Sequence, residues 1–278
     1  MITITKRNAA TAFKALLLMA TMAVAGKANA QFYSGAMSSS GGGKITLNAG
    51  AISTSGTPSI IIGYGPGYAY SDKIEPRSVD FNIQPAFMLT FETETELKYE
   101  LRHGAGFNFI YSKYQWMADF DGNDLGDVNY DYRFGKKTQS MLIEMGYNMS
   151  YYFTERFALH GGLGIGADLQ FDRYHRGEAI RKSNGQLYND PDVNEWHEMD
   201  FDMPLDIDFS GYFIIRAEYN ITESFFVGLT GHFKHAFAGT SFPKSTDLYT
   251  GPSVGYNVYI LDGKFNRLSA FLTLGFIM

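Results

Sequence analysis

An acidic stretch of the chain carries the residue types that a hard cation would need. The sequence DFDGNDLGDVNYD, Asp119 to Asp131, places Asp and Asn oxygens at close spacing, as calcium-binding loops do. It departs from the EF-hand pattern, because Asp124 stands where the turn glycine belongs and Tyr130 where a bidentate glutamate is needed. We therefore predict an exposed acidic turn, with a loose surface calcium site as the alternative.

Two histidine-containing stretches raise the questions of zinc binding and hydrolysis. His232 and His235 are three residues apart, so on a strand their side chains point to opposite faces and do not form a metal-binding pair. The segment Trp196 to Asp200, followed by Asp202, puts a histidine and acidic groups beside the longest polar stretch, where a surface hydrolase would hold them. No nucleophile motif accompanies them. We predict no enzymatic activity, no catalytic, cofactor-binding or metal-binding residues and no cofactor, and keep a hydrolase acting on lipid or peptide as an alternative.

A third set of charged residues lies on the polar face of segments that alternate apolar and polar residues. The set comprises Glu100, Arg102, Glu144, Asp168, Arg216, Glu218 and Lys234. If these segments enclose one narrow lumen, groups of both signs must pair there, because pairing offsets the cost of removing them from water. We predict a hydrogen-bonded plug of side chains, with a gated ion path as the alternative.

The elements that position these groups are predicted by an alternation with a period of two residues. From Met141 to Phe153 the odd positions are large and apolar, while the even positions are polar or small. The same pattern recurs in six further segments: 79–91, 97–111, 157–171, 205–221, 225–237 and 268–276. Soluble strands average five or six residues, whereas these runs have the length of strands that cross a membrane with apolar side chains facing lipid. The pattern therefore favours a transmembrane β-barrel over a soluble sandwich or a lipocalin-like barrel.

The segments between the strands are of two kinds. Short turns are expected at Phe91–Glu96, Phe153–Arg156 and Ile221–Ser224, and long polar loops at Ala118–Lys137, Tyr174–Pro204 and Gly239–Leu248. Short turns on one side and long loops on the other are typical of outer-membrane barrels. Aromatic residues gather near strand ends, at Tyr151-Tyr152-Phe153 and Phe225-Phe226, which suits a girdle at the membrane interface.

The first thirty residues have the parts of a secretory signal peptide. Lys6, Arg7 and Lys14 precede an apolar run, Ala15 to Ala25, and Ala28-Asn29-Ala30 forms a cleavage site before Gln31. We expect residues 31–43 to be a flexible segment and residues 44–278 to form the barrel. Removing the four basic residues of the leader takes the net charge from −6 to −10, which disfavours nucleic-acid binding, and the chain has no cysteine.

Several motifs together resemble a known family. They are the Ala-Asn-Ala-Gln cleavage site, the turns YYFTERFALHGGLGIG and AEYNITESFFVGLTGHF, the segment DMPLDIDFSGYF and the glycine- and aromatic-rich end of the chain. They are similar to the small, porin-like outer-membrane β-barrel proteins of Bacteroidetes-type bacteria. The resemblance implies an all-β antiparallel barrel located in the outer membrane.

We therefore expect an all-β, transmembrane antiparallel barrel of eight to ten strands with a lumen filled by side chains. It would act without enzymatic activity, supporting the envelope and presenting surface loops, and a small porin or ion channel is the alternative. The expected partners are outer-membrane lipid, lipopolysaccharide and the barrel-assembly machinery, with a monomeric chain.

The end of the chain raises a question of strand count. In the final segment Leu268, Leu272 and Phe276 would face lipid, whereas Phe271 and Thr273 would face inward. If both this segment and Thr250–Ile260 crossed the membrane, the C-terminus would emerge outside. Either Thr250–Ile260 does not cross, which leaves eight strands counted from Ser59, or a turn is assigned to the wrong side. Adding Lys44–Ser53 as a strand would give ten.

Overall fold

The computed structural model describes residues 42–64, 69–70, 74–98, 100–188, 196–198, 206–237, 257–261 and 265–278. Thirteen β-strands are described. None of the described residues forms a helix that is long and apolar enough to span a membrane. The predicted signal peptide and the start of the predicted flexible segment lie outside the described residues.

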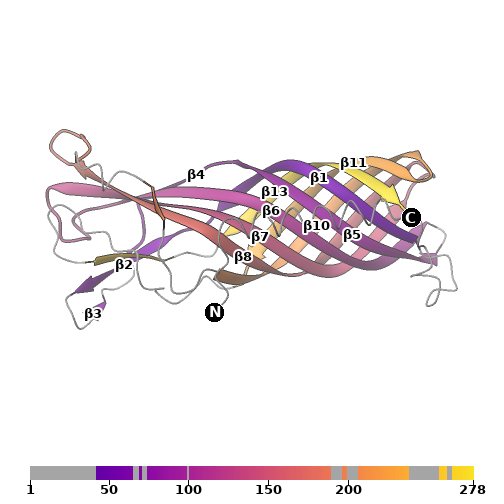
Figure 1. Ribbon diagram of the computed structural model, residues 1–278, viewed down its shortest axis with the longest axis horizontal. Helices are drawn as coiled ribbons and strands as arrows, with labels where there is room; N and C mark the ends of the chain where they lie inside the picture. The colour runs from indigo at the N-terminus through magenta and orange to yellow at the C-terminus, as the bar shows by residue number, and fades with distance from the viewer. Residues whose placement is uncertain are drawn as a thin grey trace.

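Eight long antiparallel strands close into a barrel (Figure 1). Their order is β10-β11-β13-β1-β5-β6-β7-β8, and pairing of β8 with β10 closes the ring. The strands are β1 (Gly42–Ser55), β5 (Gln84–Lys98), β6 (Leu101–Phe120), β7 (Tyr130–Tyr152), β8 (Phe157–Arg181), β10 (Asp206–Thr222), β11 (Phe225–Ala236) and β13 (Asn266–Ile277). The prediction of an antiparallel barrel with eight to ten strands is confirmed.

Five short strands lie outside this ring. β4 (Ser78–Phe81) pairs with the end of β6, and β9 (His197–Glu198) pairs with β8. β2 (Ser59–Tyr64), β3 (Ala69–Tyr70) and β12 (Asn257–Leu261) form a separate sheet. Of the stretch Thr250–Ile260, only the residues from Asn257 onward are described, and they pair with β2 and not with a barrel strand, as the first of the two topologies required.

The predicted number of eight strands is right, but the first of them does not begin at Ser59. The first barrel strand is β1, which pairs with β5 on one side and with β13 on the other. Its outward positions include Ala49 and Ala51, whose small side chains make the alternation weak in the sequence. With β1 in place, both described ends of the chain lie at the short-turn end, where Met278 N donates to Gly43 O at 2.8 Å.

The predicted turn Phe91–Glu96 is also wrong, because β5 continues through it to Lys98. The other two short turns fall where they were expected, between β7 and β8 and between β10 and β11. Two predicted loops are shorter than expected, because β6, β7 and β8 run on past the barrel to Phe120, Tyr130 and Arg181. We call this three-stranded continuation the extension; it projects from the barrel end opposite the short turns (Figure 1).

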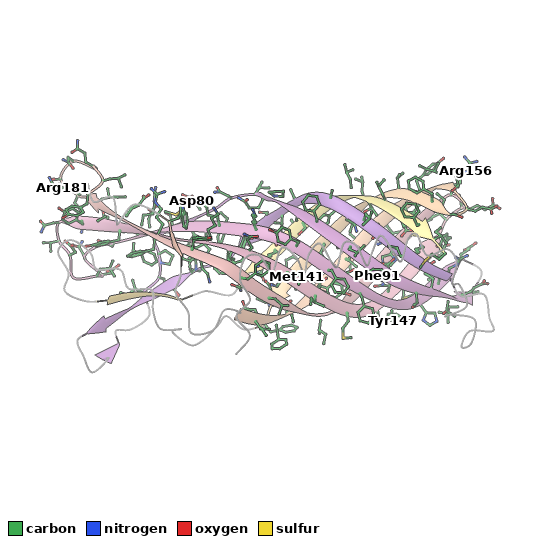
Figure 2. All side chains as sticks on the ribbon, in the orientation of Figure 1. Asp80, Phe91, Met141, Tyr147, Arg156 and Arg181 are labelled. Carbon is green, nitrogen blue, oxygen red and sulfur yellow. The ribbon has the colours of Figure 1, made fainter. Side chains whose placement is uncertain are left out.

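An apolar belt covers the outside of the barrel. In β13 the exposed positions are Leu268, Leu272, Leu274 and Phe276, and Phe271 and Thr273 are buried, as the alternation predicted. Phe209, Leu163 and Leu229 are each more than 60% exposed, and Figure 2 shows such side chains standing outward around the barrel. A closed sheet satisfies every backbone group within the ring, and an apolar outer face suits lipid. The fold is therefore that of a transmembrane, outer-membrane-type β-barrel.

Candidate functional site in the barrel lumen

The lumen at the short-turn end contains a network of five buried charged side chains. Arg216, on β10, lies with Nη2 2.5 Å from Glu92 Oε2, and its Nε donates to Glu218 Oε1 at 2.7 Å. Lys44, on β1, lies with Nζ 2.8 Å from both Glu94 Oε1 and Glu218 Oε2. We call these five residues the lower network. Strand parity places them inside, and each charge faces at least one opposite charge, so burial is offset by pairing.

Polar neighbours complete the lower network. Glu94 accepts hydrogen bonds from Ser150 Oγ at 2.7 Å and from Tyr152 OH at 2.9 Å. His160 Nε2 lies 3.2 Å from Glu92 Oε1, and its Nδ1 lies 3.0 Å from Ser150 Oγ. Glu94 therefore has hydrogen-bond donors in addition to its cation, and Glu92 has an imidazole nitrogen close by, as buried charges need polar neighbours.

An aromatic ring packs against the same network. Phe226, on β11, is fully buried, with its ring centroid 5.4 Å from Lys44 Nζ and 5.7 Å from the Arg216 guanidinium carbon. Its cross-strand partner is Gly275, where an added Cβ would overlap the ring. The prediction that Phe226 and Tyr152 belong to an interfacial girdle is wrong, because both side chains turn inward, away from lipid.

A second group of paired charges lies further along the lumen. Asp168 Oδ2 is 2.5 Å from Lys234 Nζ and 2.7 Å from Arg267 Nη2. His232 Nε2 lies 2.9 Å from Glu144 Oε1. We call these five residues the upper network. It joins residues of β7, β8, β11 and β13, so it ties four strands together across the lumen.

Apolar side chains fill the lumen beside the upper network. Leu142 is the cross-strand partner of Asp168, and Ile214 is the partner of His232. They belong to a buried cluster formed by Ile52, Ala86, Met88, Ile110, Leu142, Tyr212, Ile214 and Phe271. Among the described residues, the lumen is thus occupied by side chains from the lower network to the upper network.

The structure brings together most of the charged residues that the alternation assigned to the lumen. Glu144, Asp168, Arg216, Glu218 and Lys234 are all buried there, as predicted.

Two members of the predicted set lie elsewhere. Glu100 is exposed in the β5–β6 turn, where it accepts a hydrogen bond from Tyr151 OH at 2.9 Å. Arg102 lies at the mouth of the lumen with 39% of its side chain exposed, 3.6 Å from Glu94 Oε2. Glu100 lies in a turn, so the alternation of a strand does not direct its side chain inward.

Four buried network residues were missed, Lys44, Glu92, Glu94 and Arg267, and so was the buried neighbour His160. Glu92 and Glu94 had been assigned to a turn, although they alternate with Phe91 and Thr93 as strand residues do. His160 stood on the polar face of its segment but was not counted among the charges. Alternation was the signal that could have identified Glu92, Glu94, His160 and Arg267, whereas the weak alternation of β1 gave little signal for Lys44.

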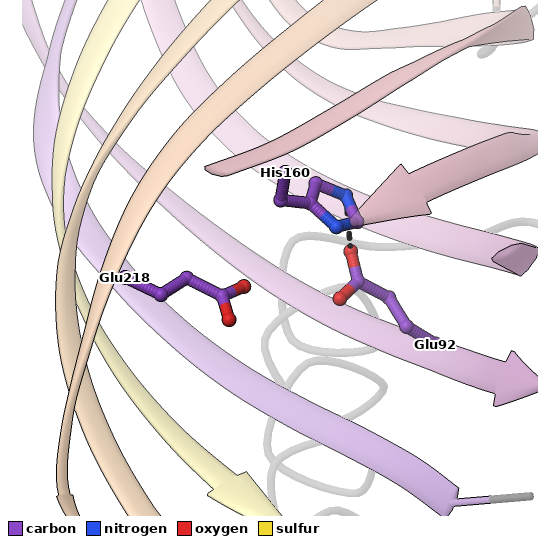
Figure 3. A group of neighbouring side chains, drawn as sticks. All are labelled: Glu92, His160 and Glu218. Atoms are coloured by element: carbon purple, nitrogen blue, oxygen red, sulfur yellow. Dashed lines mark ion pairs between the residues drawn. The ribbon is translucent and has the colours of Figure 1, made fainter. Parts of the chain in front are cut away.

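Three residues of the lower network region have the composition of a metal site. Oxygen and nitrogen atoms of Glu92, His160 and Glu218 lie within 4.8 Å of one another (Figure 3). However, Arg216 donates hydrogen bonds to both glutamates, and Lys44 contacts Glu218. A divalent cation would have to displace these internal cations, so the donor set fits an ion-pair network better than a metal centre.

The acidic loop also has an internal cation. Lys182 Nζ lies 3.3 Å from Asp121 Oδ1, 3.0 Å from Asn123 Oδ1 and 3.6 Å from Asp131 Oδ1. The carbonyl oxygen of Asp127 also accepts from this ammonium group, at 3.3 Å. These are the oxygen types that calcium would bind, and the lysine ammonium occupies the position between them. The geometry therefore supports the acidic turn rather than the calcium alternative.

Hydrogen bonding fixes the charge state of this loop. A hydrogen bond from the Asn123 backbone N–H, with Lys182 and Arg77 nearby, lowers the pKa of Asp121 below its ordinary value. Hydrogen bonds from Arg133 lower the pKa of Asp119 in the same direction, and the Arg133 pKa is raised in turn. The lowered pKa values favour the ionised carboxylates that these ion pairs need.

The remaining histidine candidates do not converge. His232 is buried in the upper network, whereas His235 is exposed with Nδ1 2.8 Å from Asn266 Oδ1, so the prediction that they face opposite sides is confirmed. Of the candidate hydrolase segment, only Trp196, His197 and Glu198 are described, and Met199, Asp200 and Asp202 lie outside the described residues.

Comparisons with known proteins give no family assignment. No family model matches the sequence, and no curated protein matches it. Similar solved structures include Ail, the attachment invasion locus protein of Yersinia pestis, with 12% identity over 85% of this chain and 99% of that chain, at a TM-score of 0.33. The outer membrane protease OmpT from Escherichia coli has 10% identity over 85% and 97% of the two chains, at a TM-score of 0.40. The outer membrane protein OprG from Pseudomonas aeruginosa has 14% identity over 86% and 98%, at a TM-score of 0.36. At these values the likeness carries no argument about what this chain binds or does, and the fold rests on its own strand pairing.

Proposed function

We propose that this outer-membrane β-barrel is a closed, non-enzymatic scaffold that supports the envelope and holds the extension at the cell surface. The observation that carries the proposal is the occupied lumen, where two ion-pair networks and an apolar cluster fill the interior. A barrel of eight strands has an interior just wide enough for its side chains. The placement among porin-like barrels of Bacteroidetes-type bacteria is part of the same proposal and rests on the sequence motifs.

The location has a direct test. The chain should fractionate with the outer membrane and show heat-modifiable mobility on gels, because a closed barrel resists unfolding in detergent until it is heated. Recovery in the inner membrane or the soluble fraction would contradict the proposed location.

Conductance tests the closed lumen. The purified barrel in planar lipid bilayers should give no discrete conductance steps, since ion-paired and apolar side chains occupy the lumen. Steps that disappear in Arg216→Gln or Glu144→Gln, but persist in the exposed-turn control Arg156→Gln, would contradict the scaffold and identify the networks as parts of a pore.

A gated ion path is the second candidate, and one observation favours it. Tyr212 OH, His232 Nδ1 and Ser269 Oγ are buried polar atoms without a hydrogen-bond partner among the described residues. Buried polar groups normally find partners, so such atoms suit a path along which water or ions pass. The same bilayer measurement separates the two functions.

The absence of enzymatic activity is tested separately. We expect no turnover of a panel of lipids and peptides by the purified barrel. Turnover that is lost in His197→Ala or Asp200→Ala would establish the hydrolase in place of the scaffold.

A further inference from the structure

The apolar belt ends at a defined level on β6 and β7. On β6 the outward residues from Leu101 to Tyr111 include no Asp, Glu, Lys or Arg, and on β7 those from Met141 to Tyr151 are apolar or aromatic. Eleven strand residues, tilted by about 45°, cross roughly 25 Å, which is the height of the apolar band of an outer-membrane barrel. The next outward side chains toward the extension therefore lie at the level of the lipid headgroups.

Two exposed lysines lie just past this edge. Lys113 pairs in register with Gln139, and Lys137 pairs with Gln115, so the two lysines are diagonal neighbours on the same outward face. Diagonal neighbours are about 7–8 Å apart at the backbone, and two long lysine side chains can reach one anion from that separation. The edge also carries aromatic groups, since Lys137 Nζ lies 5.8 Å from the centroid of the Tyr174 ring.

These lysines differ from the basic residues further along the extension. Arg133 Nε lies 2.6 Å from Asp119 Oδ1, and Arg176 Nη2 lies 2.7 Å from Glu178 Oε1. Neither Lys113 nor Lys137 has an ion pair with any carboxylate of the described residues. In a chain with a net charge of −6, two neighbouring cations without a carboxylate partner among the described residues are available to an external anion.

We infer that Lys113 and Lys137 bind the phosphate groups of an outer-leaflet glycolipid, the lipid A part of lipopolysaccharide. Their level at the edge of the hydrocarbon favours a lipid headgroup over a dissolved ligand, and their charge complements a phosphate. Tyr111 and Phe171, whose ring centroids are 6.5 Å apart on the same face, border the headgroup layer as interfacial aromatic residues do. The inference rests on the proposed location, with the extension outside the cell.

Native mass spectrometry of the purified barrel, titrated with diphosphoryl lipid A, tests this inference. Each lysine near an anionic lipid contributes about a five-fold factor in affinity, so Lys113→Gln with Lys137→Gln should weaken binding roughly 25-fold. Lys98→Gln is the matched control, because Lys98 is also exposed but lies at the short-turn end. The paired substitution Lys113→Arg with Lys137→Arg should retain binding.

Two ligand controls identify the source of the phosphate. Lipid A without its phosphates should bind the unchanged barrel about as weakly as diphosphoryl lipid A binds the double glutamine variant, and inorganic phosphate at lipid concentrations should not compete. The inference would be overturned if the double glutamine variant bound lipid A as tightly as the unchanged barrel, or if Lys98→Gln weakened binding as much as the double variant does. It would also be overturned if the unchanged barrel bound dephosphorylated lipid A as tightly as diphosphoryl lipid A. Competition by inorganic phosphate would overturn the glycolipid as the ligand. If the lipid A binding test fails while the protein still fractionates with the outer membrane, the proposed location stands and only the binding site is wrong.

Discussion

The barrel and the extension share three strands but reverse the polarity of their faces. Inside the barrel, the inward residues of β6 include Asn108 and Ser112, and Phe107 faces outward. Past the belt, with strand parity unchanged, Trp116 is buried inward and Asp119 lies outward in an ion pair with Arg133. On β6 the reversal occurs within one continuous strand without a change of parity, although the β7–β8 pairing shifts register between Lys137 and Gln139 at the same level.

The comparison separates the two determinants of a residue's environment. The pleat of the strand decides which face a side chain takes, and the surrounding medium decides which face must be apolar. In the barrel, lipid covers the outside, so charges are confined to the lumen and must pair there. In the extension the interior is an aromatic core that includes Trp116, Phe120, Tyr132, Phe134 and Phe265.

The largest effect should follow from removing the cation that the lower network shares. Arg216→Met leaves Glu92 and Glu218 buried without their guanidinium partner, and breaking a buried pair in this way costs about 3–5 kcal/mol. Urea unfolding of the refolded barrel in lipid vesicles measures the loss. Arg156→Met, in the exposed β7–β8 turn, is the matched control and should change little. A variant of Arg216 as stable as the control would mean that the lower network does not stabilise the barrel.

Removing an aromatic side chain from the extension should have a local effect. Phe134 is fully buried, with its ring stacked on Tyr132 at 6.0 Å between centroids. Phe134→Ala should lower the stability of the extension by about 3 kcal/mol, the lower end of the range for a buried phenylalanine. Hydrogen exchange should accelerate in β6 and β7 beyond the belt, while the heat-modifiable mobility of the barrel stays unchanged. Loss of that mobility would show that the two regions do not fold independently.

The reversal of polarity also explains what the sequence could and could not predict. Where apolar residues face lipid, the alternation is long and regular, so most of the barrel strands were recognised from it. In the extension the apolar face changes sides and charged pairs take the outer positions, so the stretches around Phe120 and Tyr130 resembled polar loops. These stretches do alternate, but their apolar residues face inward, whereas in the barrel the apolar residues face outward.

The pairing of residues within the lower network was missed for a different reason. Arg216 was assigned to the lumen, yet its partner Glu92 lies 124 residues away in the sequence. Alternation gives the face of a residue but not its neighbours across the lumen, because those depend on the register and closure of all the strands. Glu92 and Glu94 were moreover assigned to a turn, and glutamate is depleted in strands, although the threonines between and beside them favour a strand.

A charge placed on the outer face should have a different cost in the barrel, which lipid surrounds, and in the extension, which lies beyond the belt. Leu272 is 69% exposed in the middle of β13, and Leu272→Arg should cost about 2–4 kcal/mol because the guanidinium enters the hydrocarbon. Gln115→Arg, on the outward face of β6 past the belt, should change stability by less than about 0.5 kcal/mol. Both variants are compared by urea unfolding in the same vesicles. Equal costs at the two positions would contradict the level assigned to the edge of the belt.

The smallest effect should come from the exposed ion pair of the extension. Hydrogen bonds from Arg133 lower the pKa of Asp119 below its ordinary value of 3.8, so this pair stabilises the folded extension above that pH. The stabilisation is lost as the pH falls through the lowered pKa, because the protonated carboxyl group no longer attracts the guanidinium. Solvent screens a pair that is about one-third exposed, which limits its contribution to less than about 1 kcal/mol. Hydrogen exchange of β6 and β7 beyond the belt, in the unchanged chain and in Arg133→Gln, should therefore differ slightly at pH 6, and the difference should shrink as the pH falls through the lowered pKa of Asp119. A difference that does not change with pH would mean that Arg133 stabilises the extension through packing instead of through its charge.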